Sequence, residues 1–97
     1  MMIYFDNAAT SLPKPARVTE AVAAAMTTMG NCGRGAHPGS RMAGRVVYEA
    51  RRKLARFFAC DRVEYVIFTS NATHGLNMVI NGLFSPGDHV QTVFLKG

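Results

Sequence analysis

Apolar residues recur every three to four positions over residues 15–29, which is the spacing of one face of an α-helix. Pro15 suits the first turn of such a helix, because its nitrogen has no hydrogen to leave unpaired. Gly30 and Asn31 follow the last apolar position and are typical of a helix C-terminus. The predicted apolar stripe consists of Val18, Val22, Ala25, Met26 and Met29. The pattern therefore predicts an amphipathic helix that packs against a core.

A second helical pattern, over residues 41–58, follows a loop that is rich in glycine. Residues 30–40 contain four glycines and one proline, which excludes a helix and disfavours a strand. Ser40 is placed to cap the helix that follows the loop. The buried stripe of this second helix is expected to consist of Ala43, Val46, Val47, Ala50, Leu54, Phe57 and Phe58.

Residues 64–94 change to the pattern of a strand, a helix and a second strand. Residues 64–69 have a continuous apolar centre, which fits a parallel strand covered on both faces. A helical stripe begins near Ala72, and the Ser-Pro-Gly-Asp sequence at residues 85–88 has the signature of a type II turn. Residues 89–94 read as the second strand. The segment therefore predicts a parallel βαβ unit with a right-handed crossover.

A chain of 97 residues is long enough for one domain with a modest core. Its hydrophobic content of 48% and charged content of 18% are ordinary for a folded globular protein and exclude a disordered one. Eleven Lys and Arg against six Asp and Glu give a net charge of +5. No aromatic residues are interleaved with the basic residues of helix 41–58, so a solvated face is favoured over a nucleic-acid surface.

Targeting and redox signals point to a cytoplasmic setting. The N-terminus lacks the basic start and long apolar run of a signal peptide, and no apolar run is long enough to span a bilayer. Cys32 and Cys60 form neither a CxxC motif nor a metal-binding spacing. We therefore expect free thiols, no metal site, and neither a membrane nor a nucleic acid as a partner.

The junction at residues 69–73 is the first candidate for chemistry. Ligands of parallel α/β sheets bind beyond the carboxyl ends of the strands, where this junction is expected to lie. A helix that begins near Ala72 directs unpaired backbone N–H groups toward the junction, and the Thr73 hydroxyl adds one more donor for a phosphate group. Ser70 or Asn71 can instead cap the helix without any ligand, and spacing alone favours this alternative. Neither a Walker A motif nor GxGxxG is present, which argues against a nucleotide.

Three segments, in this order and spacing, resemble the start of the class V aminotransferase-like family. They read YFDNAATSLPKP at residues 4–15, GRGAHPGSRMAG at residues 33–44, and VIFTSNATHGLNMVINGL at residues 66–83, the last followed by PGDHV. The family consists of fold-type I enzymes that depend on pyridoxal 5′-phosphate and includes cysteine desulfurases and selenocysteine lyases. The resemblance covers the chain up to about residue 92.

The resemblance implies that residues 1–97 are a single incomplete domain from the N-terminal portion of an α/β, fold-type I transferase. Residues 1–15 would form an N-terminal arm, residues 15–58 two helices joined by the loop 30–40, and residues 64–94 the βαβ start of the large cofactor-binding domain. The whole enzyme would be a homodimer of the transferase or lyase type. It would bind a small, cysteine-like amino acid and remove its sulfur to leave alanine.

Roles for individual residues follow from the same resemblance. Ala72 and Thr73 match the pair whose backbone and hydroxyl hold the phosphate of the cofactor. The substrate pocket is matched by Asn7, Ala8, Ala9, Arg34 and His37. His37 has an alternative interpretation, as a loop residue that makes only a local hydrogen bond, and the sequence leaves both open.

Two departures from the family pattern change what the chain is expected to do. His74 stands where many family members have glutamate, and a plain residue of the first helical turn is favoured over a role at the cofactor. The lysine that forms a Schiff base with the cofactor has no counterpart, because Lys14, Lys53 and Lys96 do not match its position. We therefore expect no catalytic residue in this chain and no activity from it alone.

Two functions of other classes stay open on the sequence. A small α/β module that binds phosphate or nucleotides through a helix N-terminus would fold by itself and bind phosphate esters saturably. A basic nucleic-acid binder would lose affinity steeply as salt is raised. Neither explains why the Asn7 segment and the Arg34 loop accompany the junction at residues 69–73.

Overall fold

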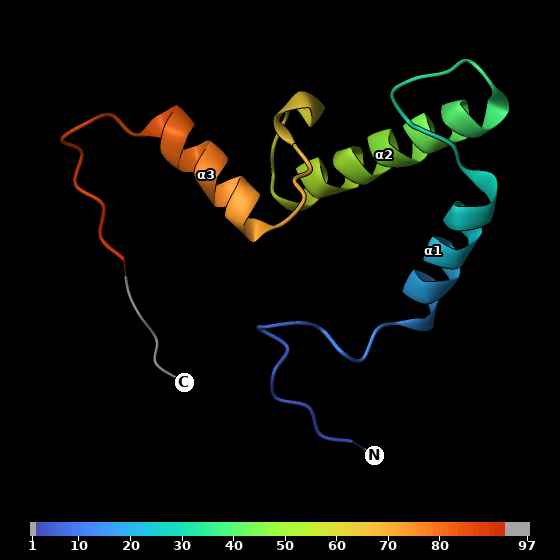
Figure 1. The fold of residues 1–97 in the computed structure, drawn as a ribbon, viewed down its shortest axis with the longest axis horizontal. Coiled ribbons are helices and arrows are strands. Elements are labelled where there is room, and N and C mark those ends of the chain that lie inside the picture. Colours follow the sequence, from blue (N-terminus) through green and yellow to red (C-terminus); the bar gives the residue numbers. More distant parts are fainter. Residues whose placement is uncertain (1, 93–97) are drawn as a thin grey trace. The chain divides into compact units, whose positions relative to one another are not determined.

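The computed structural model describes residues 2–92, which form three α-helices and one short 3-10 helix (Figure 1). The elements are α1 (Ala16–Thr28), α2 (Pro38–Phe57), η1 (Val63–Tyr65) and α3 (Ala72–Leu83). The chain divides into two compact units, Met1–Val66 and Ile67–Gly97. The first unit contains α1, α2 and η1, and the second contains α3.

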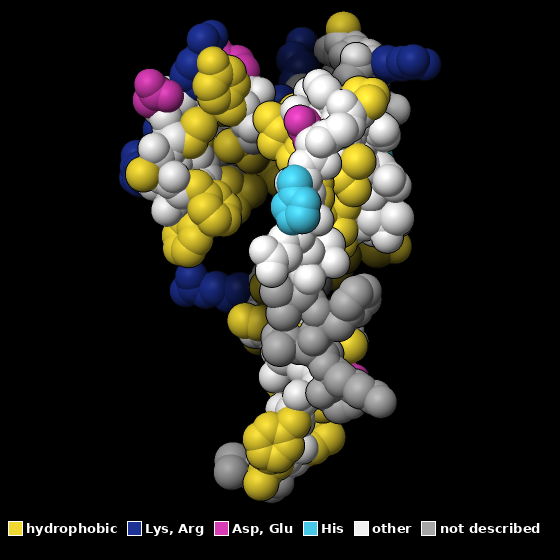
Figure 2. Space-filling view, turned by 90° about the vertical axis from the view of Figure 1, so that its left-hand side faces the viewer, with side chains coloured by type: hydrophobic (Ala, Val, Ile, Leu, Met, Phe, Trp, Pro, Cys, Tyr) yellow, Lys and Arg dark blue, Asp and Glu magenta, His cyan; other side chains and the backbone are white. Residues whose placement is uncertain are grey.

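Helix α1 confirms the helix predicted over residues 15–29. Pro15 is the N-cap rather than a residue of the first turn, and Met29 ends the helix in an extended conformation with φ −107° and ψ 140°. Ala25 and Met29 are half-buried. The other positions of the apolar stripe are exposed: Val18, Val22 and Met26. Exposed hydrophobic side chains are evident on the surface of the molecule (Figure 2).

Helix α2 begins earlier than predicted, at Pro38, and its N-cap is His37 rather than Ser40. Nδ1 of His37 accepts the backbone N–H of Ser40 at 3.3 Å. Pro38 takes the first helical position, where a missing N–H costs nothing. Ser40 lies inside the helix and is 3% exposed, and its hydroxyl is hydrogen-bonded to the backbone carbonyls of Asn31 and Arg34. The Ser40 hydroxyl therefore ties the glycine-rich loop to the first turn of α2.

The buried part of the first unit is small and lies along α2. Ala43 and Ala55 are 6% and 3% exposed, and η1 packs against the helix. The half-buried members of the predicted stripe are Val47, Ala50 and Leu54. Phe57 and Phe58 were predicted to be buried, but they are 80% and 71% exposed and contact each other edge to face. A periodic stripe identifies residues that share a face, but it does not determine how far along the helix that face is covered.

Helix α2 ends in a Schellman motif built on Ala59. The N–H of Ala59 donates to the carbonyl of Arg56 at 3.2 Å, and the N–H of Cys60 donates to the carbonyl of Ala55 at 2.8 Å. Ala59 has a φ of 53°, in the left-handed region that favours glycine. Cys60 is a half-buried free thiol whose Sγ donates to the carbonyl of Arg62 at 3.2 Å. The motif pairs the last carbonyl groups of the helix without using glycine.

The βαβ unit predicted over residues 64–94 does not appear in the structure. Val63–Tyr65 form η1 where the sequence predicts the first strand to begin, and Val66 is extended with φ −89° and ψ 117°. Residues 89–92 are not in a strand, and the rest of the second predicted strand lies outside the described residues. Within residues 2–92 no strand ladder is formed. A strand exists only through hydrogen bonds to a neighbouring strand, so an apolar sequence alone cannot make one.

The second unit confirms the helix expected from Ala72 and the type II turn after it. In the turn, the N–H of Asp88 donates to the carbonyl of Ser85 at 3.1 Å, and Gly87 has the positive φ, 96°, that this turn requires. A carboxylate oxygen of Asp88 accepts the N–H of Ser85 at 2.7 Å. The apolar stripe of α3 is exposed throughout: Leu76, Val79, Ile80 and Leu83.

Candidate functional site

The start of α3 is held by hydrogen bonds among neighbouring polar residues. Asn71 is the N-cap, and its Oδ1 accepts the backbone N–H of His74 at 2.8 Å. Nδ1 of His74 accepts the backbone N–H of Ser70 at 3.3 Å. The Thr69 hydroxyl donates to the backbone carbonyl of Asn71 at 3.0 Å. Of the two predicted capping residues, the structure thus assigns the cap to Asn71.

This cap leaves unused the donors that the sequence predicts for a phosphate. Among residues 2–92, nothing accepts a hydrogen bond from the backbone N–H groups of Ala72 and Thr73 or from the Thr73 hydroxyl. Both residues are exposed and are the first two of a helix of 12 residues. Their N–H groups therefore lie at the positive end of the helix dipole, where anions are stabilised. Capping and phosphate binding, which were alternatives on the sequence, use different N–H groups and are compatible.

Gly75 allows Thr69 to lie close to the first turn of α3. A Cβ at Gly75 would be 3.4 Å from the Thr69 hydroxyl oxygen, and Gly75 donates its N–H to the carbonyl of Asn71 at 3.1 Å. The sequence pattern placed Thr69 in the junction at residues 69–73 but gave neither Thr69 nor Gly75 a role of its own. The sequence shows a threonine two residues before the N-cap and a glycine in the first turn. Only the folded turn shows that the two lie close together.

The N-terminal arm carries a turn that contains three predicted substrate residues, Asn7, Ala8 and Ala9. The N–H groups of Ala9 and Thr10 both donate to the carbonyl of Asp6, at 3.1 and 3.2 Å. The Tyr4 hydroxyl spans the turn and donates to the carbonyl of Thr10 at 2.9 Å. The turn is therefore closed by its own backbone, and its exposed residues face solvent.

Arg34 and His37 lie in the loop before α2. The His37 ring packs against two glycines, because a Cβ at Gly30 would lie 2.7 Å from Cε1 and a Cβ at Gly35 would lie 3.3 Å from Cδ2. Nδ1 of His37 accepts the N–H of Ser40, so the proton of the neutral ring is on Nε2. The local hydrogen bond that the sequence allowed for His37 is confirmed, while its role toward a substrate stays a prediction.

The predicted site residues fall into two groups. The first unit contains the predicted substrate residues Asn7, Ala8, Ala9, Arg34 and His37, and the second contains the predicted phosphate residues Ala72 and Thr73. Each group is organised locally, by hydrogen bonds within its own segment.

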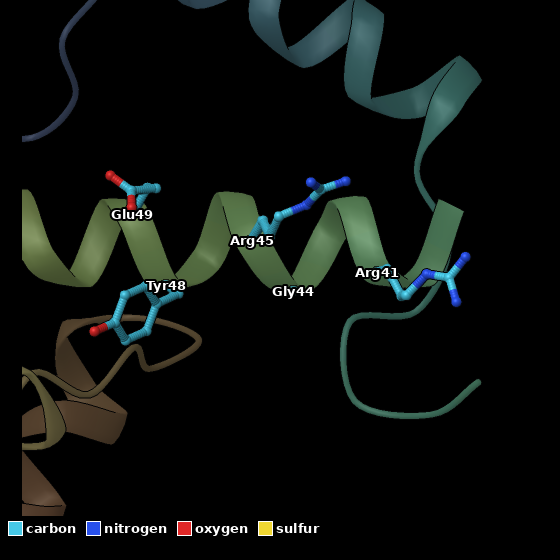
Figure 3. A pocket seen from close by; sticks show the side chains of 5 residues that line it. All are labelled: Arg41, Gly44, Arg45, Tyr48 and Glu49. Atoms are coloured by element: carbon cyan, nitrogen blue, oxygen red, sulfur yellow. The ribbon is translucent and has the colours of Figure 1, made fainter. Parts of the chain in front are cut away.

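A cavity of about 580 Å³ lies along α2 and is lined by Arg41, Gly44, Arg45, Tyr48 and Glu49 (Figure 3). Arg45 and Glu49 project to one side of the helix in this view, and Tyr48 projects to the other. The Glu49 carboxylate is already paired with Arg52 at 3.0 Å. Because the polar groups diverge and the wall comes from a single helix, this hollow is not a candidate for the substrate site.

In the part of the chain that the structure describes, no three His, Cys, Asp or Glu side chains gather closely enough to hold a metal ion. None of the helices formed by residues 2–92 is both long and apolar enough to cross a membrane.

Comparison with known proteins shows where the chain belongs. The model of the family Aminotransferase class-V matches residues 3–95. A Pyrococcus abyssi protein named "Probable cysteine desulfurase" is 41% identical over 96 residues, covering 94% of this chain and 23% of that protein. "Cysteine desulfurase IscS" of Rickettsia akari is 42% identical over 82 residues, covering 84% of this chain and 20% of that protein. A "Probable cysteine desulfurase" of Streptomyces coelicolor is 39% identical over 83 residues, with shares of 84% and 20%.

No solved structure matches the chain. The chain spans about a fifth of the length of the curated relatives that it matches, with shares of 23%, 20% and 20% for these three. The family match nevertheless covers nearly all of this sequence, including the three segments on which the resemblance was based. The chain belongs to the aminotransferase class-V family, whose cofactor is pyridoxal 5′-phosphate.

Proposed function

We propose that this chain is part of a cysteine desulfurase-like enzyme in which the N-terminus of α3 binds the phosphate of pyridoxal 5′-phosphate. The observation that carries the proposal is the donor set at Ala72 and Thr73. It consists of two backbone N–H groups and one hydroxyl that have no partner among residues 2–92. A phosphate ester has the charge and the acceptor oxygens that fit these donors. Membership of the family supports the identity of the molecule that carries the phosphate.

The residues around these donors have separate tasks. Asn71 takes up the N–H of His74, so that the first turn of α3 is closed while the two N–H groups before it stay free. Thr69 donates to the carbonyl of Asn71 and thereby holds the segment that enters the helix. Thr73 contributes a hydroxyl hydrogen to the phosphate. When bound, the cofactor ring supplies an electron sink for chemistry at the α-carbon of an amino acid. This chain contributes the hydrogen-bond donors that bind the phosphate and contributes no catalytic group.

We propose cysteine, or a similarly small amino acid, as the substrate of the whole enzyme, with alanine as the product after removal of sulfur. The printed names of the relatives support this class of substrate. Arg34 has a guanidinium that is suited to a substrate carboxylate, and the turn at Asn7 would line the same pocket. His37 offers the hydrogen on Nε2, because its Nδ1 is engaged by Ser40.

The whole enzyme is further proposed to be a cytoplasmic homodimer of the transferase or lyase type. The two free thiols, Cys32 and Cys60, are in keeping with a reducing compartment. The exposed apolar stripes of α1 and α3 favour burial against further parts of such an enzyme. We also propose that the segment 64–94 forms its βαβ unit when neighbouring strands pair with it, because strands require such partners.

Titration of the ¹⁵N-labelled 97-residue chain in phosphate-free buffer tests the proposal. Pyridoxal 5′-phosphate and inorganic phosphate should shift the amide signals of Ala72 and Thr73, and pyridoxal without phosphate should not. Thr73→Val should weaken binding by between about tenfold and about a hundredfold, because a hydrogen bond to a charged group contributes about 1.5–3 kcal/mol. Thr73→Ser keeps the hydroxyl and should bind like the wild type.

Thr27→Val is the matched control, since the Thr27 hydroxyl donates within α1 to the carbonyl of Ala24 at 3.1 Å. Unshifted amides at residues 72 and 73, or equal affinity of the Thr73→Val and wild-type chains, would refute the phosphate site. Equal binding of pyridoxal 5′-phosphate and other phosphate esters would favour the small phosphate-binding module instead.

A further inference from the structure

Four exposed arginines of α2 share one face of the helix and are named here the arginine stripe. Its members are Arg41, Arg45, Arg52 and Arg56. At 3.6 residues per turn, these positions fall within an arc of about 60° and extend over about 22 Å of the helix. The cavity of about 580 Å³ on α2 lies along the first half of the stripe (Figure 3). The helix therefore presents a long, hollowed and basic face to solvent.

Most of the positive charge on the arginine stripe has no partner in the described part of the chain. Within residues 2–92, neither Arg41, Arg45 nor Arg56 forms an ion pair. Arg52 is paired with Glu49 at 3.0 Å, and both of these side chains are about half exposed. Such an exposed pair contributes little to stability, because water screens it. The counter-charge for three of the four arginines must therefore come from outside residues 2–92.

The arginine stripe is expected to stay at the surface of the whole enzyme. An arginine is almost never fully buried unless it is paired, because an unpaired charge is costly to remove from water. The buried Ala43 and the half-buried Leu54 lie about 180° around the helix from the centre of the stripe, so the face of α2 that packs is a different one. Another part of the enzyme that covered the stripe would have to neutralise several charges.

The residue types on this face favour an acidic protein as the partner. Arginine is enriched in protein–protein interfaces and lysine is depleted there. The stripe contains arginine alone, since Lys53, the lysine of α2, lies about 60° outside the arc. Each guanidinium can bind a carboxylate through two parallel hydrogen bonds, which the ammonium group of a lysine cannot do.

Other partners fit this face less well. The carboxylate of Glu49 lies between the two halves of the stripe. The regularly spaced phosphates of a nucleic acid, or the surface of an anionic membrane, would meet this like charge. A second copy of the chain would place one basic stripe against another, and like charges repel. A protein has separate carboxylates, which can pair with the arginines and avoid Glu49.

We propose that the arginine stripe is a docking surface for an acidic face of a partner protein. The intervals along the stripe are four, seven and four residues, which is the same in both directions. A partner helix with carboxylates at these intervals therefore fits the stripe in either orientation. The inference goes beyond the proposed function, because it involves neither the cofactor phosphate nor the predicted substrate residues.

Binding of a designed peptide to the ¹⁵N-labelled 97-residue chain tests the inference. The probe is an alanine-based helical peptide of about four turns, with glutamates at the intervals of the stripe. At an ionic strength of about 0.01 M, where screening is weak, it should shift the amide signals of residues 41–56. The same peptide with lysines in place of the glutamates should not shift them. Raising the ionic strength to about 0.15 M should weaken the binding of the glutamate peptide.

Two double substitutions remove equal amounts of charge from the chain. Arg41→Gln with Arg45→Gln removes half of the stripe and should weaken binding of the glutamate peptide about fivefold, or about 1 kcal/mol shared between two exposed ion pairs. Lys14→Gln with Arg17→Gln is the matched control, because both residues are exposed and lie outside α2. The control should bind within about twofold of the wild type. Far-UV circular dichroism should show equal helix content, since glutamine is a good helix former.

Each other outcome overturns the inference. If both double substitutions weaken binding equally, the peptide recognises the net charge of +5 rather than the stripe. If single-stranded oligothymidine or phosphatidylserine vesicles bind more tightly than the glutamate peptide at equal salt, the partner is a nucleic acid or a membrane. Unshifted amides at residues 41–56 would leave the stripe a solvated face. None of these results affects the proposed function, which depends on phosphate binding at residues 72 and 73.

Discussion

Replacing Ala59 by glycine is expected to stabilise the C-terminus of α2. Ala59 has a φ of 53°, so its backbone is in the left-handed region, where the two hydrogen bonds of the Schellman motif hold it. That region costs a residue with a side chain about 1–2 kcal/mol. Glycine removes this cost. It also has more conformational freedom in the unfolded chain, which destabilises the folded state by about 0.4–1 kcal/mol. The net stabilisation is therefore about 1 kcal/mol, which raises a midpoint by about 5 °C in a domain of this size.

Thermal unfolding of the 97-residue chain, followed by circular dichroism at the helix band, measures the effect. Ala23→Gly is the matched control, because Ala23 is exposed within α1 and the same change there should destabilise a helix by about 1 kcal/mol. Opposite signs for the two substitutions are the expected result. A lower midpoint for Ala59→Gly would show that residue 59 does not have the left-handed conformation that the Schellman motif requires.

Two more substitutions test the loop and the turn. Ser40→Ala removes a buried hydroxyl that is bonded to two loop carbonyls and should destabilise the first unit by about 1–3 kcal/mol, seen as a lower urea midpoint; the exposed Ser11→Ala should not change it. Gly87→Ala places a Cβ at a φ of 96° and should weaken the turn by about 1 kcal/mol, measured as faster hydrogen exchange of the Asp88 N–H. Gly82→Ala is the control: Gly82 lies inside α3 with open space around it, so this substitution should instead raise helix content. An unchanged exchange rate in Gly87→Ala would contradict the turn assignment.

Much of the local structure was predictable because its causes are close together in the sequence. The period of apolar residues predicted α1 within one residue of its bounds and the start of α3 at Ala72, and the Ser85–Asp88 turn follows from a proline and a glycine at adjacent positions. The capping alternative at the start of α3 was also correct, since Asn71 bonds to a residue only three positions away. Helix and turn hydrogen bonds join neighbours in the chain, so a short window of sequence contains them.

The errors arose where a residue's partner lies farther away. Ser40 was predicted to cap α2, but its hydroxyl instead joins carbonyls six and nine residues earlier in the loop, and His37 supplies the cap. Phe57 and Phe58 fit the periodic stripe, yet they are exposed because nothing in the described unit covers that part of α2. The strands predicted in the segment 64–94 required neighbouring strands that the pattern alone could not supply.

The sequence by itself determined where the helices and the turn form and which small and polar residues precede α3, because those features depend on bonds between residues three or four apart. The segments at residues 4–15, 33–44 and 66–83, in their order and spacing, also identified the family. Only the tertiary structure decided which of those polar groups are already engaged. It showed that the Ser40 hydroxyl is bonded to the loop carbonyls of Asn31 and Arg34, and that the N–H groups of Ala72 and Thr73 have no acceptor among residues 2–92. Free donors at a helix start are a property of geometry, since the same residue types can pair in several ways until the backbone turn selects one.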